Sequence, residues 1–116
     1  MSGISTHVLD LSAGRPGAGM AVTLLRGSEA GEWTEIGRAV TDADGRAKSF
    51  PGAGAAAALS RGHYRLRFDT GAYFASRGIK PFFPFVEISF AIEDERQNYH
   101  VPLLLSPFGY STYRGS

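Results

Sequence analysis

The stretch that decides the fold is Val86–Ile92, which reads VEISFAI. Bulky apolar side chains occupy every second position in it, with glutamate, serine and alanine between them. Side chains of a β-strand point alternately to opposite faces, so this stretch predicts a strand with one face in the core and the other in solvent. The segment His63–Asp69, which reads HYRLRFD, repeats the pattern with arginine at the polar positions. Both stretches therefore predict half-buried strands.

Weaker alternation on either side predicts further strands, separated by turns. These strands are expected at residues 4–9, 20–26, 33–40, 99–105 and 110–114, and Arg46 is expected to begin another. Asp42–Gly45 (DADG) predicts a tight hairpin turn, because the Asp-Gly pair supplies the positive φ that such a turn needs. A short helix is expected at residues 71–77, with Asp69-Thr70 as its cap and Gly78 after its end.

Two segments qualify this pattern. Pro102 lies inside the penultimate strand, and because proline has no N–H to donate, the sequence predicts a sheet edge or a bulge there. The alanine-rich segment 51–58 is expected to be a loop, with a buried turn of helix as the alternative. Eight short strands with turns at these spacings indicate an all-β fold, an antiparallel β-sandwich with one short helix.

The composition fits one domain, expected to span residues 1–116. Twelve basic residues nearly balance eleven acidic ones, which argues against a nucleic-acid or membrane-surface binder, since both need a concentrated basic face. The chain has no cysteine, which excludes disulfides, thiol nucleophiles and thiolate metal sites. No stretch approaches the ~20 apolar residues of a membrane span, and no secretory signal opens the chain, so a cytoplasmic location is expected.

Histidine is the main candidate for acid–base chemistry near neutral pH, and the chain has three, at positions 7, 63 and 100. His63 alternates with arginines and is expected on a solvent-facing surface. His7 shares one face of its strand with Ser5 and Leu9, and His100 lies opposite the apolar residues of its strand. For each, a histidine with no catalytic role is the simpler interpretation. The three are too scattered to form a local metal motif, and no Gly-x-Ser-x-Gly or phosphate-loop motif occurs. The motifs therefore predict no metal site and no cofactor.

The C-terminal segment Leu103–Ser116 is unusual, because it stays apolar and aromatic to within four residues of the last one. Chain termini usually fray and are polar. The segment predicts a final strand that is held in a sheet or in an interface, and simple core packing is the alternative.

Four motifs together resemble the 5-hydroxyisourate hydrolases, the transthyretin-related proteins of purine breakdown. They are STHVLD at 5–10, TDADGR at 41–46, YHVPLLLSP at 99–107 and YRGS at 113–116. The resemblance covers essentially the whole chain, and YRGS in the last four positions is its most specific element. Family members often carry a second histidine two positions before the one at 100, where this chain has Asn98.

The resemblance implies an eight-stranded transthyretin-like sandwich and a homotetramer, with active sites in a channel where two dimers meet. Members open the ring of 5-hydroxyisourate with water and no cofactor, giving 2-oxo-4-hydroxy-4-carboxy-5-ureidoimidazoline in urate catabolism. The resemblance also implies a set of functional residues. In this chain they are His7, Arg46, His100 and the terminal Tyr113, Arg114, Gly115 and Ser116. The first three are the expected catalytic residues. His7, Arg46 and the terminal four are the expected substrate-binding residues.

These residue types suit the chemistry. Opening a cyclic acyl–nitrogen bond needs a base for water, an acid for the leaving nitrogen and donors for the oxyanion. His7 and His100 are expected to share the proton transfers, with either one as the base, while Arg46 binds and polarises the substrate through its planar fork of donors. Tyr113 and Ser116 are expected to close the pocket or to hold the substrate. The alternative function is a non-catalytic carrier of a small aromatic ligand, because a fold does not fix a function.

Overall fold

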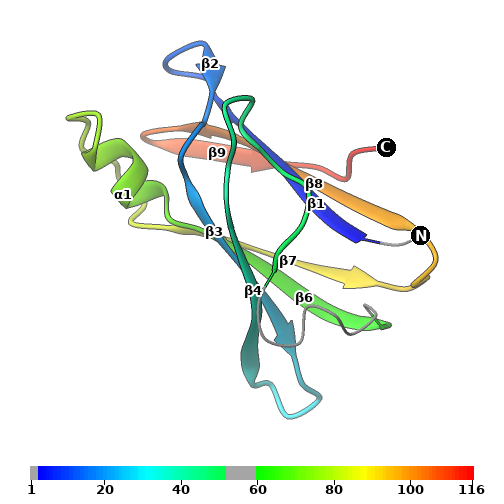
Figure 1. Cartoon of the computed structure of the whole chain (residues 1–116). Helices are drawn as coiled ribbons and strands as arrows, with labels where there is room; N and C mark the ends of the chain where they lie inside the picture. The colour runs from blue at the N-terminus through cyan, green and yellow to red at the C-terminus, as the bar shows by residue number, and fades with distance from the viewer. Residues whose placement is uncertain (1–2, 52–59) are drawn as a thin grey trace.

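The computed structural model describes residues 3–51 and 60–116, which form two β-sheets packed face to face with one short helix beside them (Figure 1). The all-β sandwich expected from the sequence is confirmed. The loop expected at residues 51–58 lies, apart from residue 51, outside the described residues. Within the described ranges, no helix is long and apolar enough to cross a membrane.

The strands divide between the two sheets. The first sheet has the order β2 (Arg15–Pro16), β1 (Gly3–Asp10), β8 (Asn98–Ser106) and β9 (Gly109–Thr112), and β5 (Arg46–Ala47) also pairs with β1. The second sheet has the order β4 (Trp33–Val40), β3 (Ala21–Gly27), β6 (Gly62–Phe68) and β7 (Val86–Ile92). Eight of these strands correspond to the eight expected, and β2 is an additional strand of two residues in the loop after β1.

One strand pair departs from the antiparallel pattern. β1 and β8 run parallel, from Gly3 opposite Asn98 to Asp10 opposite Leu105, whereas the other strand pairs of the described residues are antiparallel. Parallel neighbours cannot be joined by a tight turn, and these two strands come from opposite ends of the chain. Figure 1 shows the start of β1, the start of β8 and the C-terminal segment at one end of the molecule.

The alternation seen in the sequence sets which side chains form the core. On β6, Tyr64, Leu66 and Phe68 are fully buried, and on β8 the residues Tyr99 and Leu103 face them from the other sheet. The remaining positions on each strand point away from the sandwich interior. His7 and His100 belong to these outward positions of the first sheet, and both are half-buried.

The helix α1 (Thr70–Ala75) lies where it is expected, but it ends two residues earlier. Asp69 occupies the N-cap position without a side-chain capping bond, so the expected cap is wrong in that respect. The helix is instead attached to β1, because the Tyr73 hydroxyl donates to Asp10 Oδ2 at 2.7 Å. Burial raises the pKa of the Asp10 carboxyl, but its hydrogen bonds, above all the one from Tyr73, outweigh burial and hold the pKa below its usual range.

Two local expectations are corrected by the topology. The Asp42–Gly45 turn forms, with Gly45 at φ 76° and its N–H donating to the Asp42 carbonyl at 2.9 Å, but it does not close a hairpin. The turn carries the chain from β4 in one sheet to β5 in the other. Pro102 lies in the central strand β8, not at an edge. The pairing of β8 with β9 ends beside it, at Leu103 opposite Thr112, and returns only as a single bridge between His100 and Gly115.

Candidate active site

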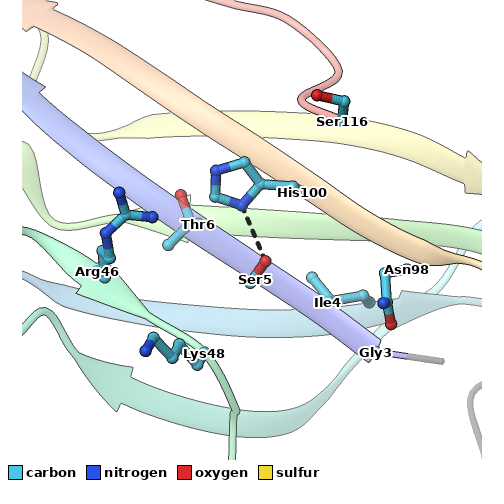
Figure 2. Close-up of a pocket in the computed structure, with 9 residues that line it drawn as sticks. All are labelled: Gly3, Ile4, Ser5, Thr6, Arg46, Lys48, Asn98, His100 and Ser116. Carbon is cyan, nitrogen blue, oxygen red and sulfur yellow. Dashed lines mark hydrogen bonds between the residues drawn. The ribbon is translucent and has the colours of Figure 1, made fainter. Parts of the chain in front are cut away.

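A cavity of about 420 Å³ opens on the outer face of the first sheet (Figure 2). Segments from both ends and from the middle of the chain line it. Its polar lining includes Ser5, Arg46, Lys48, Asn98, His100 and Ser116. Strand pairing explains why these distant residues meet, because β1 lies between β8 on one side and β5 on the other.

The register of β1 brings three of the expected residues to this face. Ser5 lies opposite His100 on β8, and His7 lies opposite Arg46 on β5. Arg46, His100 and Ser116 line the cavity itself, while His7 follows Ser5 two positions along the same face of β1. The two histidines and the arginine expected from the sequence are therefore placed on one surface.

His100 is held and electrostatically biased by its neighbours. Its Nδ1 lies 2.8 Å from the hydroxyl oxygen of Ser5. Burial lowers the pKa of His100 below its ordinary value of 6.5, and the charges of Arg46 and His7 lower it further. A histidine with a lowered pKa stays neutral at pH 7, which is the state a general base needs.

His7 has a different partner. Its Nε2 lies 2.9 Å from the backbone carbonyl oxygen of Asp44, in the turn that precedes β5. A carbonyl oxygen only accepts hydrogen bonds, so this nitrogen carries the hydrogen, and Nδ1 is the ring atom left to exchange a proton. The turn at Asp42–Gly45 thus orients His7 as well as delivering Arg46 to the same surface.

The four C-terminal residues divide between two places. Gly115 packs on His100: its N–H donates to the His100 carbonyl at 2.8 Å, and a Cβ at this position would lie 2.5 Å from the Cδ2 of the ring. Ser116 then enters the cavity. Tyr113 and Arg114 line a second cavity of about 250 Å³ beside β7. Arg114 donates to the Gln97 side chain at 2.8 Å and lies 4.5 Å from the centre of the Tyr99 ring.

Two residues of the cavity were not predicted from the sequence. Ser5 was not expected to contact His100, and Lys48 was not expected as a second cation beside Arg46. Both carried a readable signal. Ser5 is the outward residue two positions before His7, and Lys48 follows Arg46 at the spacing that returns a side chain to the same face, with the buried Ala47 between them. What the pattern does not contain is the partner strand, and hence the contact.

The outer face of the second sheet carries a larger cavity, of about 570 Å³, with a different chemical character. Its charged residues are Glu35, Arg38, Arg67 and Asp69. Arg38 forms a salt bridge with Glu35 at 2.6 Å, and Arg67 lies 3.8 Å from Asp69. Opposite charges neutralise each other there, so the first cavity is the candidate active site. Across residues 3–51 and 60–116, no group of three or more acidic or histidine side chains could hold a metal ion.

Comparison with known proteins matches residues 4–115 to the family model "HIUase/Transthyretin family". The chain belongs to this family. A 5-hydroxyisourate hydrolase of Caulobacter vibrioides is 46% identical to it over 121 aligned positions, which cover 100% of both chains. The solved structure of the Klebsiella pneumoniae 5-hydroxyisourate hydrolase has a TM-score of 0.82 and 42% identity, and the match covers 97% of this chain and 98% of that one.

The family also contains transthyretins. Sea bream transthyretin, solved in complex with thyroxine, has a TM-score of 0.87 and 32% identity, with 97% of this chain and 93% of that one covered. The fold is thus at least as close to this transthyretin as to the hydrolase, so the fold does not separate the two kinds of protein. Sequence identity is higher to the hydrolases, and the two histidines and one arginine on the outer sheet face are the groups that could support hydrolysis.

Proposed function

We propose that this protein hydrolyses 5-hydroxyisourate to 2-oxo-4-hydroxy-4-carboxy-5-ureidoimidazoline, a step of urate catabolism. Relatives named 5-hydroxyisourate hydrolase match the chain along its whole length. The observation that carries the proposal is the cavity lined by both His100 and Arg46. Burial lowers the pKa of His100 there, and the charge of Arg46 lowers it further, so the neutral imidazole is favoured. A histidine base can take a proton from the attacking water, and a cationic donor can stabilise the oxyanion that forms on the carbonyl oxygen.

In the proposed mechanism, His100 is the general base. Its Nδ1 is occupied by Ser5, so Nε2 is the nitrogen available to take a proton from water. The water oxygen bonds to the ring carbonyl carbon, and the carbonyl oxygen gains negative charge. Arg46, which lines the same cavity, stabilises that oxyanion through its charged N–H donors.

His7 completes the proton transfers. The acyl carbon–nitrogen bond breaks and the leaving nitrogen takes up a proton. His7 is the proposed donor of this proton through Nδ1, because its Nε2–H is bonded to the Asp44 carbonyl in either protonation state. The new carboxylic acid then loses its O–H proton to solvent and becomes a carboxylate. Ser116 lines the same cavity and is a further proposed substrate contact. Tyr113 and Arg114 stay proposed substrate contacts on the basis of the family resemblance.

The test is the ultraviolet decay of freshly generated 5-hydroxyisourate, with and without the protein. This compound also decays unaided, so the spontaneous rate is the reference. We expect the protein to accelerate the decay in proportion to its concentration, with no added metal or cofactor. A decay rate equal to the spontaneous one, from protein shown to be folded, would contradict the proposed function.

We also propose that the protein is a homotetramer in the cytoplasm. In the sheets formed by the described residues, β9 lies at one edge of the first sheet and β7 at one edge of the second, so each has a side able to pair with another copy. Phe108 and Tyr113, next to β9, are 75% and 57% exposed. A light-scattering mass near four times 12.4 kDa would support the tetramer, and a mass near 12.4 kDa would contradict it. Cell fractionation tests the location.

A further inference from the structure

The Ser5 hydroxyl is within hydrogen-bond distance of the proposed base. Ser5 Oγ lies 2.8 Å from His100 Nδ1, although the two residues are 95 positions apart in the chain. They meet because β1 and β8 pair in parallel with Ser5 directly opposite His100. Figure 2 shows the Ser5 oxygen on one edge of the imidazole and the second ring nitrogen on the opposite edge.

A serine next to a histidine suggests a nucleophile, but the surroundings do not support that role. In serine hydrolases, the nitrogen that does not face the serine is bonded to a carboxylate, which orients the ring for proton abstraction. Among the residues the structure describes, no carboxylate forms a hydrogen bond or a salt bridge with His100. The charged groups facing the ring are cationic, namely Arg46 and His7, with Lys48 beyond them in the cavity lining.

The ring is also restrained on its far side. The backbone of Gly115 lies so close to the imidazole that a Cβ there would be 2.5 Å from Cδ2. The Gly115 N–H holds the His100 carbonyl at 2.8 Å, which keeps this backbone in place. The ring is thus confined between Ser5 on β1 and Gly115 in the C-terminal segment. In this position, Nδ1 is within hydrogen-bond distance of the Ser5 hydroxyl, so Nε2 is the ring nitrogen available to the substrate.

We propose that Ser5 is a positioning residue, which accepts a hydrogen bond from His100 Nδ1–H and thereby keeps the lone pair on Nε2. The assignment rests on the proposed function, because only a base acting through Nε2 needs that tautomer. A serine oxygen that accepts from Nδ1–H serves the neutral ring and binds the imidazolium more strongly once it has formed. Ser5 therefore acts through His100 and makes no bond to the substrate.

The first experiment reads the tautomer without catalysis. Imidazole nitrogen shifts of His100 in the 15N-labelled wild-type protein, above the pKa of the ring, distinguish Nδ1–H from Nε2–H. We expect Nδ1 to carry the hydrogen in wild type and in Ser5→Thr, and both tautomers to be populated in Ser5→Ala. A wild-type ring protonated on Nε2 would overturn the proposal. This result is independent of whether 5-hydroxyisourate is the substrate.

The second experiment compares Ser5→Ala, Ser5→Thr and the control Ser89→Ala, which removes a serine hydroxyl from β7 on the other sheet. We expect Ser5→Ala to lower kcat roughly ten- to a hundredfold, as for one lost hydrogen bond to a group that becomes charged, with little change in KM. Threonine should restore kcat to within about threefold, since it keeps the same acceptor. Ser89→Ala should behave as wild type.

The pH profile of kcat/KM distinguishes Ser5 as a hydrogen-bond acceptor from Ser5 as a donor to Nδ1 and from Ser5 as a nucleophile. Loss of an acceptor for Nδ1–H destabilises the imidazolium, so the acid limb of kcat/KM should move to lower pH in Ser5→Ala and return in Ser5→Thr. A shift to higher pH would mean that Ser5 donates to Nδ1, and the proposal would be wrong. A rate reduced to the spontaneous decay in both variants, together with a covalent intermediate in wild type, would identify Ser5 as a nucleophile instead.

Discussion

The outer faces of the two sheets both carry arginine, but they hold it in opposite ways. On the outer face of the β4-β3-β6-β7 sheet, three arginines each have a carboxylate near them: Arg38 pairs with Glu35, and Arg65 and Arg67 lie near Glu87. Two of them also stack on aromatic rings, Arg65 on Trp33 at 3.9 Å and Arg67 on Phe85 at 4.0 Å. These contacts satisfy the charge and cover apolar surface.

The face of the other sheet lacks such pairing. Arg46 and Lys48 form no side-chain salt bridge within the described part of the chain. The cavity lining around them includes histidine, serine and asparagine, and one carboxylate, Asp42, accepts a hydrogen bond from the Arg46 backbone N–H at 2.9 Å. Burial lowers the pKa of His100, and the charge of Arg46 lowers it further; the Arg46 guanidinium is also available to an anionic or carbonyl-rich ligand. Ten of the twelve cationic residues are arginine, so residue type alone does not show which ones are functional. On these two outer faces, the side-chain salt bridges separate them: Arg38, Arg65 and Arg67 have one, and Arg46 has none among the described residues.

The sharpest test of this contrast replaces one histidine on each sheet. His100→Ala should lower kcat at least ~10²-fold, the usual size of a general acid–base contribution. His63→Ala, on the exposed side of β6, is the matched control and should leave the kinetic constants unchanged. Both are measured by 5-hydroxyisourate decay at several substrate concentrations. Equal rates for the two variants would remove the distinction between the faces.

The second test replaces one arginine on each sheet. Arg46→Gln should lower kcat/KM roughly tenfold or more, because it removes charged hydrogen bonds to the substrate and the oxyanion. It should also raise the pKa of His100, since that charge disfavours the imidazolium, so the acid limb of kcat/KM should move to higher pH. Arg38→Gln serves as the control, with an unchanged rate and pH profile. An acid limb that does not move in Arg46→Gln would contradict the proposed electrostatic coupling.

The third test uses two glycines at the end of the first sheet. Gly115→Ala places a methyl group against the His100 ring, which must move, so kcat should fall about tenfold, below the ~10²-fold cost of a full 1 Å displacement. Gly109→Ala meets only the Ser106 hydroxyl, at 3.8 Å, and should keep its activity. If both variants keep wild-type kcat, the packing of Gly115 has no part in catalysis.

The smallest effect is expected on the paired face. Arg67→Gln breaks contacts of 3.8 Å with Asp69 and Glu87 on a side chain that is 42% exposed. Such surface pairs contribute at most about 1 kcal/mol, so urea unfolding should show a loss below that value and the decay assay no change. A marked loss of activity in this variant would mean that the second sheet also takes part in catalysis.

The sequence predicts faces better than it predicts neighbours. Alternation in Val86–Ile92 and His63–Asp69 identifies which side chains are buried. Alternation at residues 99–105 likewise puts His100 correctly on an outward position. It does not specify that β1 pairs with β8 in parallel, because a period of two is the same for either direction. For the same reason the contact between Ser5 and His100, and the central place of Pro102, follow only from the three-dimensional register.

The parallel pairing of β1 with β8 has a consequence for the order in which the molecule forms. β1 is synthesised before its main partner β8, which follows some ninety residues later, as the 95-position separation of Ser5 and His100 shows. Contacts of this span close slowly, since the loop entropy is lost before the pairing is gained. The second sheet, built from β3, β4, β6 and β7, has all its strands before β8 is made. Catalytic competence is therefore acquired last, and enzyme activity in a refolding experiment should report the final docking of β8, after the circular dichroism signal of the second sheet has appeared.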